Sequence, residues 1–161
     1  MASSLELRFW RICRARRAKT AFDGEGARLS PGRWNHRGVP VVYCGSSLSL
    51  ATLEYLVHVD PDELPDRLVA IHAGLPAAVA VESLDPPCLP SGWRAYPAPA
   101  ATKDLGSKWA SSLRSVALLV PSAITPNERN VILNPRHRDF GRLTRERPQP
   151  FAFERRLFRK Q

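Results

Sequence analysis

Glu54 is the residue of this sequence whose position is hardest to explain by packing. It lies in the stretch 48–58 (LSLATLEYLVH), where most of the other side chains are apolar. Removing a carboxylate from water costs several kcal/mol unless the group is paired or hydrogen-bonded. An exposed stripe of the helix or a nearby arginine partner would account for Glu54, and so would a site that stabilises positive charge.

Three other residues have the chemistry to complete a site with Glu54. Arg33 lies in a glycine-containing loop, and its guanidinium can bind a phosphate through two hydrogen bonds. Tyr43 ends an expected strand, where an aromatic ring can stack on a planar ligand. Ser122 follows another expected strand and a proline. Each also has an ordinary explanation, as a surface arginine, a core tyrosine and a turn serine.

An arginine, a tyrosine and a carboxylate together suit cleavage of an N-glycosidic bond in a dinucleotide. The sugar passes through an oxocarbenium-like cation, which a fixed carboxylate stabilises without any protein nucleophile. Other chemistries have less support, because the sequence has no nucleophile elbow, P-loop or dinucleotide-binding glycine motif. No metal is expected, since metal-ligand spacing is absent from the four histidines, His36, His58, His72 and His137.

The elements that must position these residues follow from the hydrophobic pattern. The run 48–58 predicts a buried helix with its N-cap within 45–47, and a short second helix is expected to run toward Leu113. A long loop is expected over 14–38 and an irregular segment over 86–101. Runs of β-forming residues predict strands over 5–13, 39–44, 68–72, 78–83, 115–120, 130–133 and 150–158, with a turn at Gly74–Pro76. The pattern indicates a mixed α+β fold.

Length, charge and cysteine content limit the classes of protein to which the chain can belong. A chain of 161 residues fits one domain, 1–161. Its three cysteines form no CxxC pair, its start lacks the apolar core of a signal peptide, and no run approaches the roughly 18 apolar residues of a membrane span. We therefore expect a cytoplasmic protein without a membrane partner. The net charge of +9 favours an anionic partner: nucleic acid, a nucleotide or an acidic protein.

At these residues the chain resembles the RES-domain family, which is named for its arginine, glutamate and serine. Two positions depart from the family pattern, Ser30-Pro31 in the loop and Glu154-Arg155 in the tail. The matching stretches follow the family's order over nearly the whole chain: 26–28, 32–35, 38–43, 51–58, Trp109, 120–123, 130–135 and 151–155.

The resemblance implies a single RES domain over 1–161 with a fold like that of ADP-ribosyltransferases, a split β-core with few helices and an NAD+ cleft. It implies an NAD+-consuming toxin that arrests growth and is neutralised by an Xre-type antitoxin occluding the cleft. Arg33 would bind the phosphate and ribose side of NAD+, Tyr43 would contact the nicotinamide and Glu54 would support cleavage. The complete expected site consists of Glu54, Arg33 and Tyr43 as catalytic residues, with Ser122, Trp34 and Asn134 as further NAD+-binding residues.

Two matters stay open at the level of sequence. ADP-ribose could pass to water, to inorganic phosphate or to a target protein, because members of the family differ in this step. The alternative function is a basic nucleic-acid-binding module without catalysis, which leaves Glu54 unexplained; a pure interaction protein is a third reading. If the chain is a toxin, we expect nucleic acid to be reached only through the antitoxin.

Overall fold

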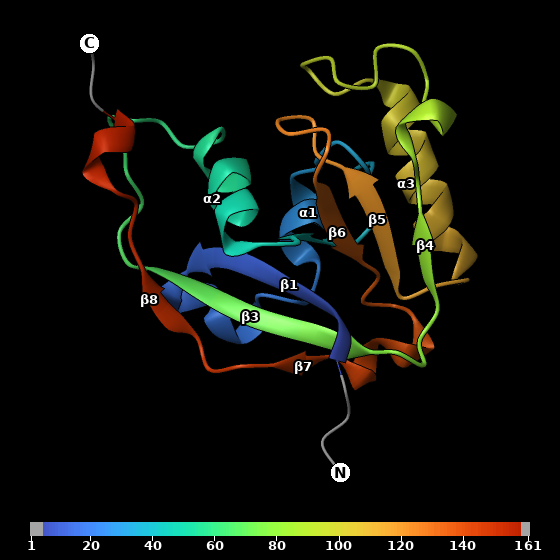
Figure 1. Cartoon of the computed structure of the whole chain (residues 1–161), viewed down its shortest axis with the longest axis horizontal. Coiled ribbons are helices and arrows are strands. Elements are labelled where there is room, and N and C mark those ends of the chain that lie inside the picture. Colours follow the sequence, from blue (N-terminus) through green and yellow to red (C-terminus); the bar gives the residue numbers. More distant parts are fainter. Residues whose placement is uncertain (1–4, 159–161) are drawn as a thin grey trace.

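The chain, described over residues 5–158 by a computed structural model, is built around one sheet (Figure 1). Its strands are β1 (Leu5–Arg14), β2 (Val42–Gly45), β3 (Leu68–Pro76), β4 (Val81–Ser83), β5 (Ala117–Pro121), β6 (Arg129–Leu133), β7 (Thr144–Arg145) and β8 (Gln149–Phe151). The strand order is β4-β5-β6-β2-β1-β3-β7, and β8 also pairs with β3. Neighbours are antiparallel except β4 and β5, which are parallel.

The sheet is split between β1 and β2. Within residues 5–158 these two strands share one register pair, Trp10 with Gly45, whereas β1 pairs with β3 along its whole length. One part of the sheet is therefore β4-β5-β6-β2, and the other is β1-β3 with β7 and β8. This arrangement confirms the predicted α+β class and the split β-core.

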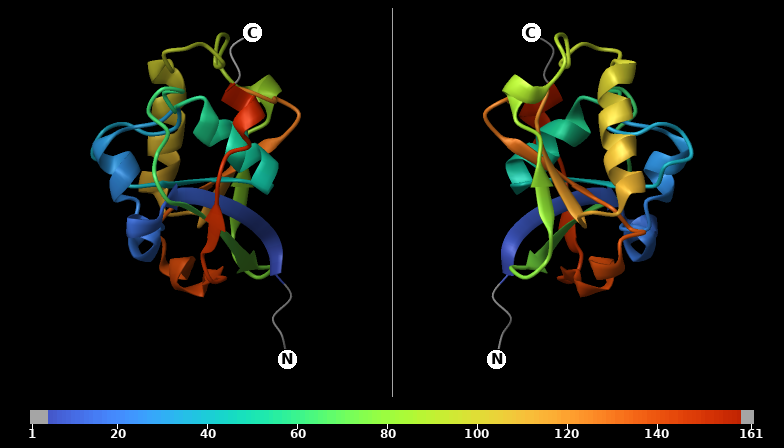
Figure 2. Two further views of the ribbon diagram at one scale, coloured as in Figure 1. Left: turned by 90° about the vertical axis from the view of Figure 1, so that its left-hand side faces the viewer. Right: turned by 90° about the vertical axis from the view of Figure 1, so that its right-hand side faces the viewer.

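Helices cover the outer faces of both parts of the sheet (Figures 1 and 2). Helix α2 (Leu48–Leu56) packs on β1 and β3 through Ala51, and α3 (Ala100–Ser112) packs on β5 and β6 through Trp109 and Ala110. The remaining helical segments are α1 (Glu25–Leu29) and the 3-10 turns η1 (Ala15–Thr20), η2 (Pro86–Cys88), η3 (Arg138–Arg142) and η4 (Arg155–Phe158).

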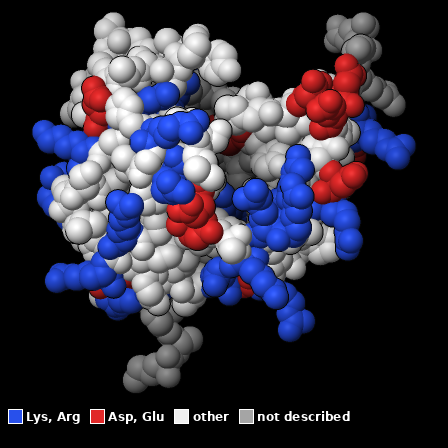
Figure 3. Space-filling view, turned by 180° about the vertical axis from the view of Figure 1, so that it is seen from behind, with Lys and Arg blue, Asp and Glu red and all other residues white. Residues whose placement is uncertain are grey.

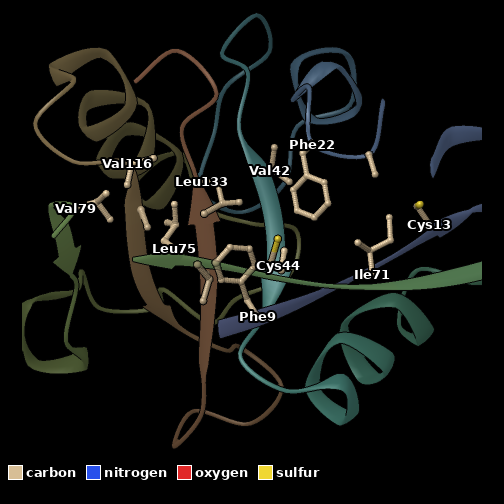
Figure 4. Packing of buried hydrophobic residues seen from close by; sticks show 14 residues of the cluster. Phe9, Cys13, Phe22, Val42, Cys44, Ile71, Leu75, Val79, Val116 and Leu133 are labelled. Atoms are coloured by element: carbon tan, nitrogen blue, oxygen red, sulfur yellow. The ribbon is translucent and has the colours of Figure 1, made fainter. Parts of the chain in front are cut away.

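The main core fills the space between the inner faces of the two parts (Figure 4). Phe9 and Leu75 come from β1 and β3, while Val42 and Leu133 come from β2 and β6. All four side chains are essentially inaccessible to solvent. Alternate residues of each strand point to this core, and the intervening residues point to the outer helices. The two parts are thus held together by side-chain packing more than by backbone hydrogen bonds.

Several expected elements differ from those observed. Gly74–Pro76 is not a turn but the end of β3, because β1 pairs with it up to Pro76 and tertiary pairing overrides local turn propensity. The segment 14–38 is not one loop, since it contains η1 and α1. The expected strand 150–158 ends at Phe151 and is followed by η4, because β3 offers partners only to residues 149–151.

Helix α2 begins where expected but is not buried all round. Its N-cap Ser47 accepts a hydrogen bond from Leu50 N at 3.0 Å. Only Leu50 and Ala51 of the helix are buried, and Val57 after it is 58% exposed. The helix covers β1 and β3 with one face and leaves the rest partly accessible. The expectation of a buried helix is therefore wrong.

Two glycines allow backbone to approach closely beside the expected site residues. A Cβ on Gly45 would lie 2.6 Å from the backbone nitrogen of Ala51, so only glycine lets α2 fold back onto the end of β2. A Cβ on Gly106 would lie 1.8 Å from the carbonyl oxygen of Trp34. The loop that carries Arg33 therefore rests directly on α3. No helix among residues 5–158 is both long enough and apolar enough to cross a membrane.

Gly106→Ala is expected to destabilise the fold, because the new methyl group collides with the backbone of Trp34 and forces α3 away from the loop. Overpacking costs about 1–3 kcal/mol, which corresponds to a loss of about 2–12 °C in Tm for a chain of this size. Thermal unfolding followed by circular dichroism measures the loss. Gly26→Ala is the control, since a Cβ there meets no atom within 4 Å; an equal Tm for both variants would contradict the close packing.

Candidate active site

The Glu54 carboxylate is held by two donors from the other part of the sheet. Its Oε1 accepts hydrogen bonds from Ser122 Oγ at 2.8 Å and from Asn130 Nδ2 at 2.6 Å. Its Oε2 receives no hydrogen bond from the described residues. Both donors therefore hold the side chain through the same oxygen, Oε1. The carboxylate bridges α2 to the ends of β5 and β6 across the split in the sheet.

Ser122 is oriented by its own neighbours to donate to Glu54. It follows β5, and its side chain is fully buried. Its Oγ accepts hydrogen bonds from the backbone nitrogens of Ile124 and Thr125 at 3.0 and 3.1 Å, so its hydroxyl proton is directed to the carboxylate. The structure thus brings Ser122 into contact with Glu54; its expected role in binding NAD+ stays a prediction.

Asn130 is a member of the site that the sequence analysis missed. It is the second residue of β6, and the register of β6 pairs it with Gly45, the last residue of β2. Its Oδ1 is buried without a hydrogen-bond partner among the described residues, while its Nδ2 donates to Glu54. A buried unsatisfied acceptor costs about 1–3 kcal/mol. The amide is therefore aligned for the carboxylate at the expense of stability.

Arg33 lies near Glu54 without forming an ion pair with it. Its Nη1 donates to the carbonyl oxygens of Trp93 and Ala95 at 2.6 and 2.8 Å. Burial lowers the pKa of Arg33, and the nearby Glu54 carboxylate acts in the opposite direction. The guanidinium stays protonated at neutral pH, because arginine in proteins does not lose its charge there. The structure thus brings Arg33 and Glu54 into one electrostatic environment.

Tyr43 holds the loop that carries Arg33. Its hydroxyl donates to Asn35 Oδ1 at 2.7 Å and accepts from the backbone nitrogen of Trp34 at 2.9 Å. Burial raises the pKa of this phenol far above its usual value, while the Trp34 N–H opposes the rise. The phenol of Tyr43 therefore stays protonated at neutral pH. The residue as a whole is half-buried. Its ring touches Gly32, where a Cβ would lie 2.8 Å from the hydroxyl oxygen.

Asn35 completes the support of this loop. The side chain is fully buried, and its Nδ2 donates to the carbonyl oxygens of Ala27, His36 and Val39 at 2.8, 3.2 and 3.1 Å. Its Oδ1 accepts from Gly32 N and from the Tyr43 hydroxyl. This single amide explains why an irregular segment can present Arg33 from a fixed backbone.

Two further residues expected to bind NAD+, Trp34 and Asn134, have buried side chains. Trp34 is 3% exposed and packs in the core beneath α3, near Trp93. Asn134 is 1% exposed and follows the far end of β6 from Asn130, where its Nδ2 donates to Ala110 O at 2.8 Å. Their side chains serve packing and a core hydrogen bond. The structure does not bring them to the Glu54 carboxylate.

The segment 93–95, together with Arg33 and Ala123, is called the rim of the site. Its carbonyls hold Arg33, and Arg94 donates from Nε and Nη2 to Ala123 O at 3.1 and 2.9 Å. Ala123 directly follows Ser122, which donates to Glu54. A series of hydrogen bonds and one peptide link therefore connects Arg33 to Glu54 by way of the segment 93–95. The surface seen from behind is hollowed between two lobes (Figure 3). Among residues 5–158 no group of three or more histidines, cysteines or acidic residues is placed to hold a metal ion.

Comparison with known proteins identifies similar chains. The family model described as RES domain matches residues 8–154. A protein named Toxin Res from Yersinia enterocolitica is 40% identical over 149 residues, which span 92% of this chain and 97% of the relative. A protein named Prs ADP-ribosylating toxin from Sphingobium is 39% identical over 156 residues, with 94% and 97% covered.

A solved structure has the same fold. The crystal structure of the Mycobacterium tuberculosis MbcT-MbcA toxin-antitoxin complex contains a chain that superposes with a TM-score of 0.71. The superposition covers 94% of this chain and 86% of that chain, at 19% sequence identity. At that identity the likeness establishes the fold.

Asn130→Asp is expected to destabilise the protein in a pH-dependent way. The variant replaces an N–H donor with a second carboxylate 2.6 Å from Glu54 Oε1, and two such groups must share a proton or repel each other. The folded state then binds more protons than the unfolded state, so the free energy of unfolding falls as pH rises. Thermal unfolding should show a Tm loss of about 5–10 °C at neutral pH, by analogy with other buried charge defects.

The loss should be smaller at acidic pH, where the pair holds a proton. Asn127→Asp, on an exposed turn three residues earlier, is the control and should change Tm by the same small amount at both pH values. An Asn130→Asp loss that does not depend on pH would mean that the amide is not directed at the carboxylate.

Proposed function

The chain belongs to the RES domain family, and we propose that it is an NAD+-consuming toxin that cleaves the nicotinamide–ribose bond and transfers ADP-ribose to an acceptor. The observation that carries the proposal is the Glu54 carboxylate, fixed through Oε1 by two donors and open at Oε2. Relatives of nearly the same length are named Toxin Res and Prs ADP-ribosylating toxin, which supports it.

Glu54 would act on the charge that develops during cleavage. The bond between the nicotinamide nitrogen and C1′ breaks, its electron pair stays on nicotinamide, and the ribose becomes a cation. A carboxylate already held by Ser122 and Asn130 stabilises that cation without reorganising. A preorganised group of this kind contributes about 10²–10³-fold to the rate. Its free Oε2 can accept a hydrogen bond from a ribose hydroxyl.

Arg33 and Tyr43 would bind the two ends of the reacting half of NAD+. The Arg33 guanidinium, attached by Nη1 to the segment 93–95, has N–H groups left to donate to phosphate oxygens. Tyr43 is partly accessible and has its hydroxyl engaged, so its ring face is the part offered to nicotinamide. The phenol is not a proton donor in this proposal, because both of its hydrogen bonds are used to fix the loop.

The acceptor of ADP-ribose is proposed to be a protein. The Sphingobium relative is named for ADP-ribosylating Prs, and this chain aligns with it over 94% of its length. Water and inorganic phosphate are the competing acceptors, and they would make the chain an NAD+ glycohydrolase or phosphorylase. Capture falls to whichever acceptor lies within bonding distance of the cation.

The partner of the toxin is proposed to be an Xre-type antitoxin that covers the site. The structural neighbour comes from a toxin–antitoxin complex, and the net charge of +9 favours an acidic partner. The basic nucleic-acid-binding alternative has less support, because it gives no purpose to a carboxylate with two dedicated donors. Cytoplasmic action follows from this proposal, since NAD+ and a cellular target are both found there.

Glu54→Gln is expected to lower NAD+ consumption by about 10²-fold or more, because the charge that meets the ribose cation is removed. The amide keeps the shape of the side chain and can still accept from Ser122 and Asn130, so the fold should be retained. Release of nicotinamide from NAD+ measures the rate, and Tm measures the fold. Glu63→Gln, on an exposed loop, is the control. A folded Glu54→Gln variant with wild-type turnover would remove Glu54 from the mechanism.

Incubation of the protein with a cell lysate and NAD+ labelled in its adenylate half should produce discrete labelled protein bands, which depend on Glu54. Mass spectrometry of the small products gives the complementary measurement. Products confined to free ADP-ribose would assign water as the acceptor. A phosphorylated ADP-ribose that increases with added phosphate would assign phosphorolysis, and either result would reject a protein acceptor.

A further inference from the structure

Two arginines at the rim of the site are positioned by backbone carbonyls rather than by a carboxylate. Arg33 donates to two carbonyl oxygens of the segment 93–95, and Arg94 donates to the carbonyl oxygen of Ala123. Among residues 5–158 neither forms an ion pair. Four other arginines do pair with a carboxylate in their neighbourhood: Arg28 with Glu25, Arg114 with Glu82, Arg129 with Asp85 and Arg156 with Glu154.

The segment 93–95 carries Arg94 and positions the guanidinium of Arg33. Arg94 lies between Trp93 and Ala95, whose carbonyls hold Arg33. The charge of Arg94 reaches Arg33, where burial lowers the pKa of Arg33 most and Arg94 lowers it further. Backbone carbonyls position both side chains, but they are neutral and do not cancel the positive charge. Two like charges held close together in this way produce a local field that favours an anion.

Each guanidinium has N–H groups available beyond those that position it. Arg33 uses Nη1 alone, and Arg94 uses Nε and Nη2, for the hydrogen bonds formed within residues 5–158. A guanidinium carries five N–H donors in a planar array that matches phosphate oxygens. Both arginines can therefore donate to an anion while their attachment to the backbone is kept.

The pair also lies at a fixed place relative to Glu54. Arg94 donates a hydrogen bond to the carbonyl oxygen of Ala123, the residue after Ser122. Ser122 in turn donates to Glu54 Oε1 at 2.8 Å. The two guanidiniums and the Glu54 carboxylate are consequently connected through Ala123 and Ser122. A ligand with an anionic group and a group that becomes cationic would find both partners in one site.

We propose that Arg94 is a second phosphate-binding residue, which together with Arg33 clamps the pyrophosphate of the dinucleotide. This inference rests on the proposed function, since it identifies how the same site would hold NAD+. The pyrophosphate carries two negative charges on neighbouring phosphorus atoms, and the site offers two guanidiniums. Arg94 binds substrate in this assignment and takes no part in bond cleavage.

The test separates binding by Arg94 from a merely structural attachment of the segment 93–95. Arg94→Gln removes the charge but keeps an amide that can donate to Ala123 O. We expect the KM for NAD+ to rise about tenfold to a hundredfold, as for loss of a charge-assisted contact to phosphate, with kcat changed less than threefold. Calorimetry should show a comparable loss of affinity for ADP-ribose, and Arg94→Lys should recover part of it.

Salt dependence provides a readout that a structural role would not change. The affinity of the wild-type protein for ADP-ribose should fall as salt is raised from about 0.05 to 0.5 M, and the affinity of Arg94→Gln should fall less steeply. Arg37→Gln, on an exposed residue of the Arg33 loop, is the matched control and should leave KM unchanged.

An Arg94→Gln variant with wild-type KM, or one that loses kcat while ADP-ribose binding is kept, would overturn the clamp but leave the proposed function intact. A wild-type protein that neither releases nicotinamide from NAD+ nor binds ADP-ribose would overturn the proposed function together with the clamp.

Discussion

The position of the Glu54 carboxylate across the split in the sheet is the constraint on which the rest of the site depends. α2 belongs to the β1–β3 part through Ala51, whereas Ser122 and Asn130 belong to the β5–β6 part. The two parts share few backbone hydrogen bonds within residues 5–158, so Glu54 is a polar connection between them. Gly45 makes this connection geometrically feasible, because only glycine lets α2 approach the end of β2 so closely.

Several features of the site lower the stability of the fold, and packing of the main core offsets their cost. Asn130 Oδ1 and Thr125 Oγ1 are buried without partners among the described residues, and Arg33 and Arg94 bring two like charges together. Each feature is unfavourable by itself. The side chains of the main core between the two parts of the sheet are buried, and their packing offsets these costs. Violations of local rules that a packed scaffold compensates are typical of functional sites.

The sequence revealed the residues whose chemistry conflicts with their surroundings. Glu54 stood out because its neighbours are apolar, and the break at 45–47 predicted where its helix begins. Asn130 could not be found in this way, because its role depends on the register that sets it opposite Gly45. The burial of Trp34 and Asn134 could not be predicted either, because it depends on packing against α3 and neighbouring segments that are distant in the sequence. The prediction of a turn at Gly74–Pro76 was wrong because pairing with β1, a segment distant in the sequence, overrides local propensity.

The arginines of this basic chain divide according to what holds them, and that division explains more than the total charge does. Arg11 donates to Tyr43 O at 2.8 Å, so an arginine from the basic N-terminal segment joins β1 to β2 beside the split. Arg114 and Arg129 pair with acidic side chains and connect β4 to its surroundings. Arg33 and Arg94 donate to carbonyl oxygens of the segment 93–95 and of Ala123, which follows Ser122, the hydrogen-bond donor to Glu54. Lys and Arg side chains are spread over the face in Figure 3, and the charge that we assign to an anionic ligand is that of Arg33 and Arg94.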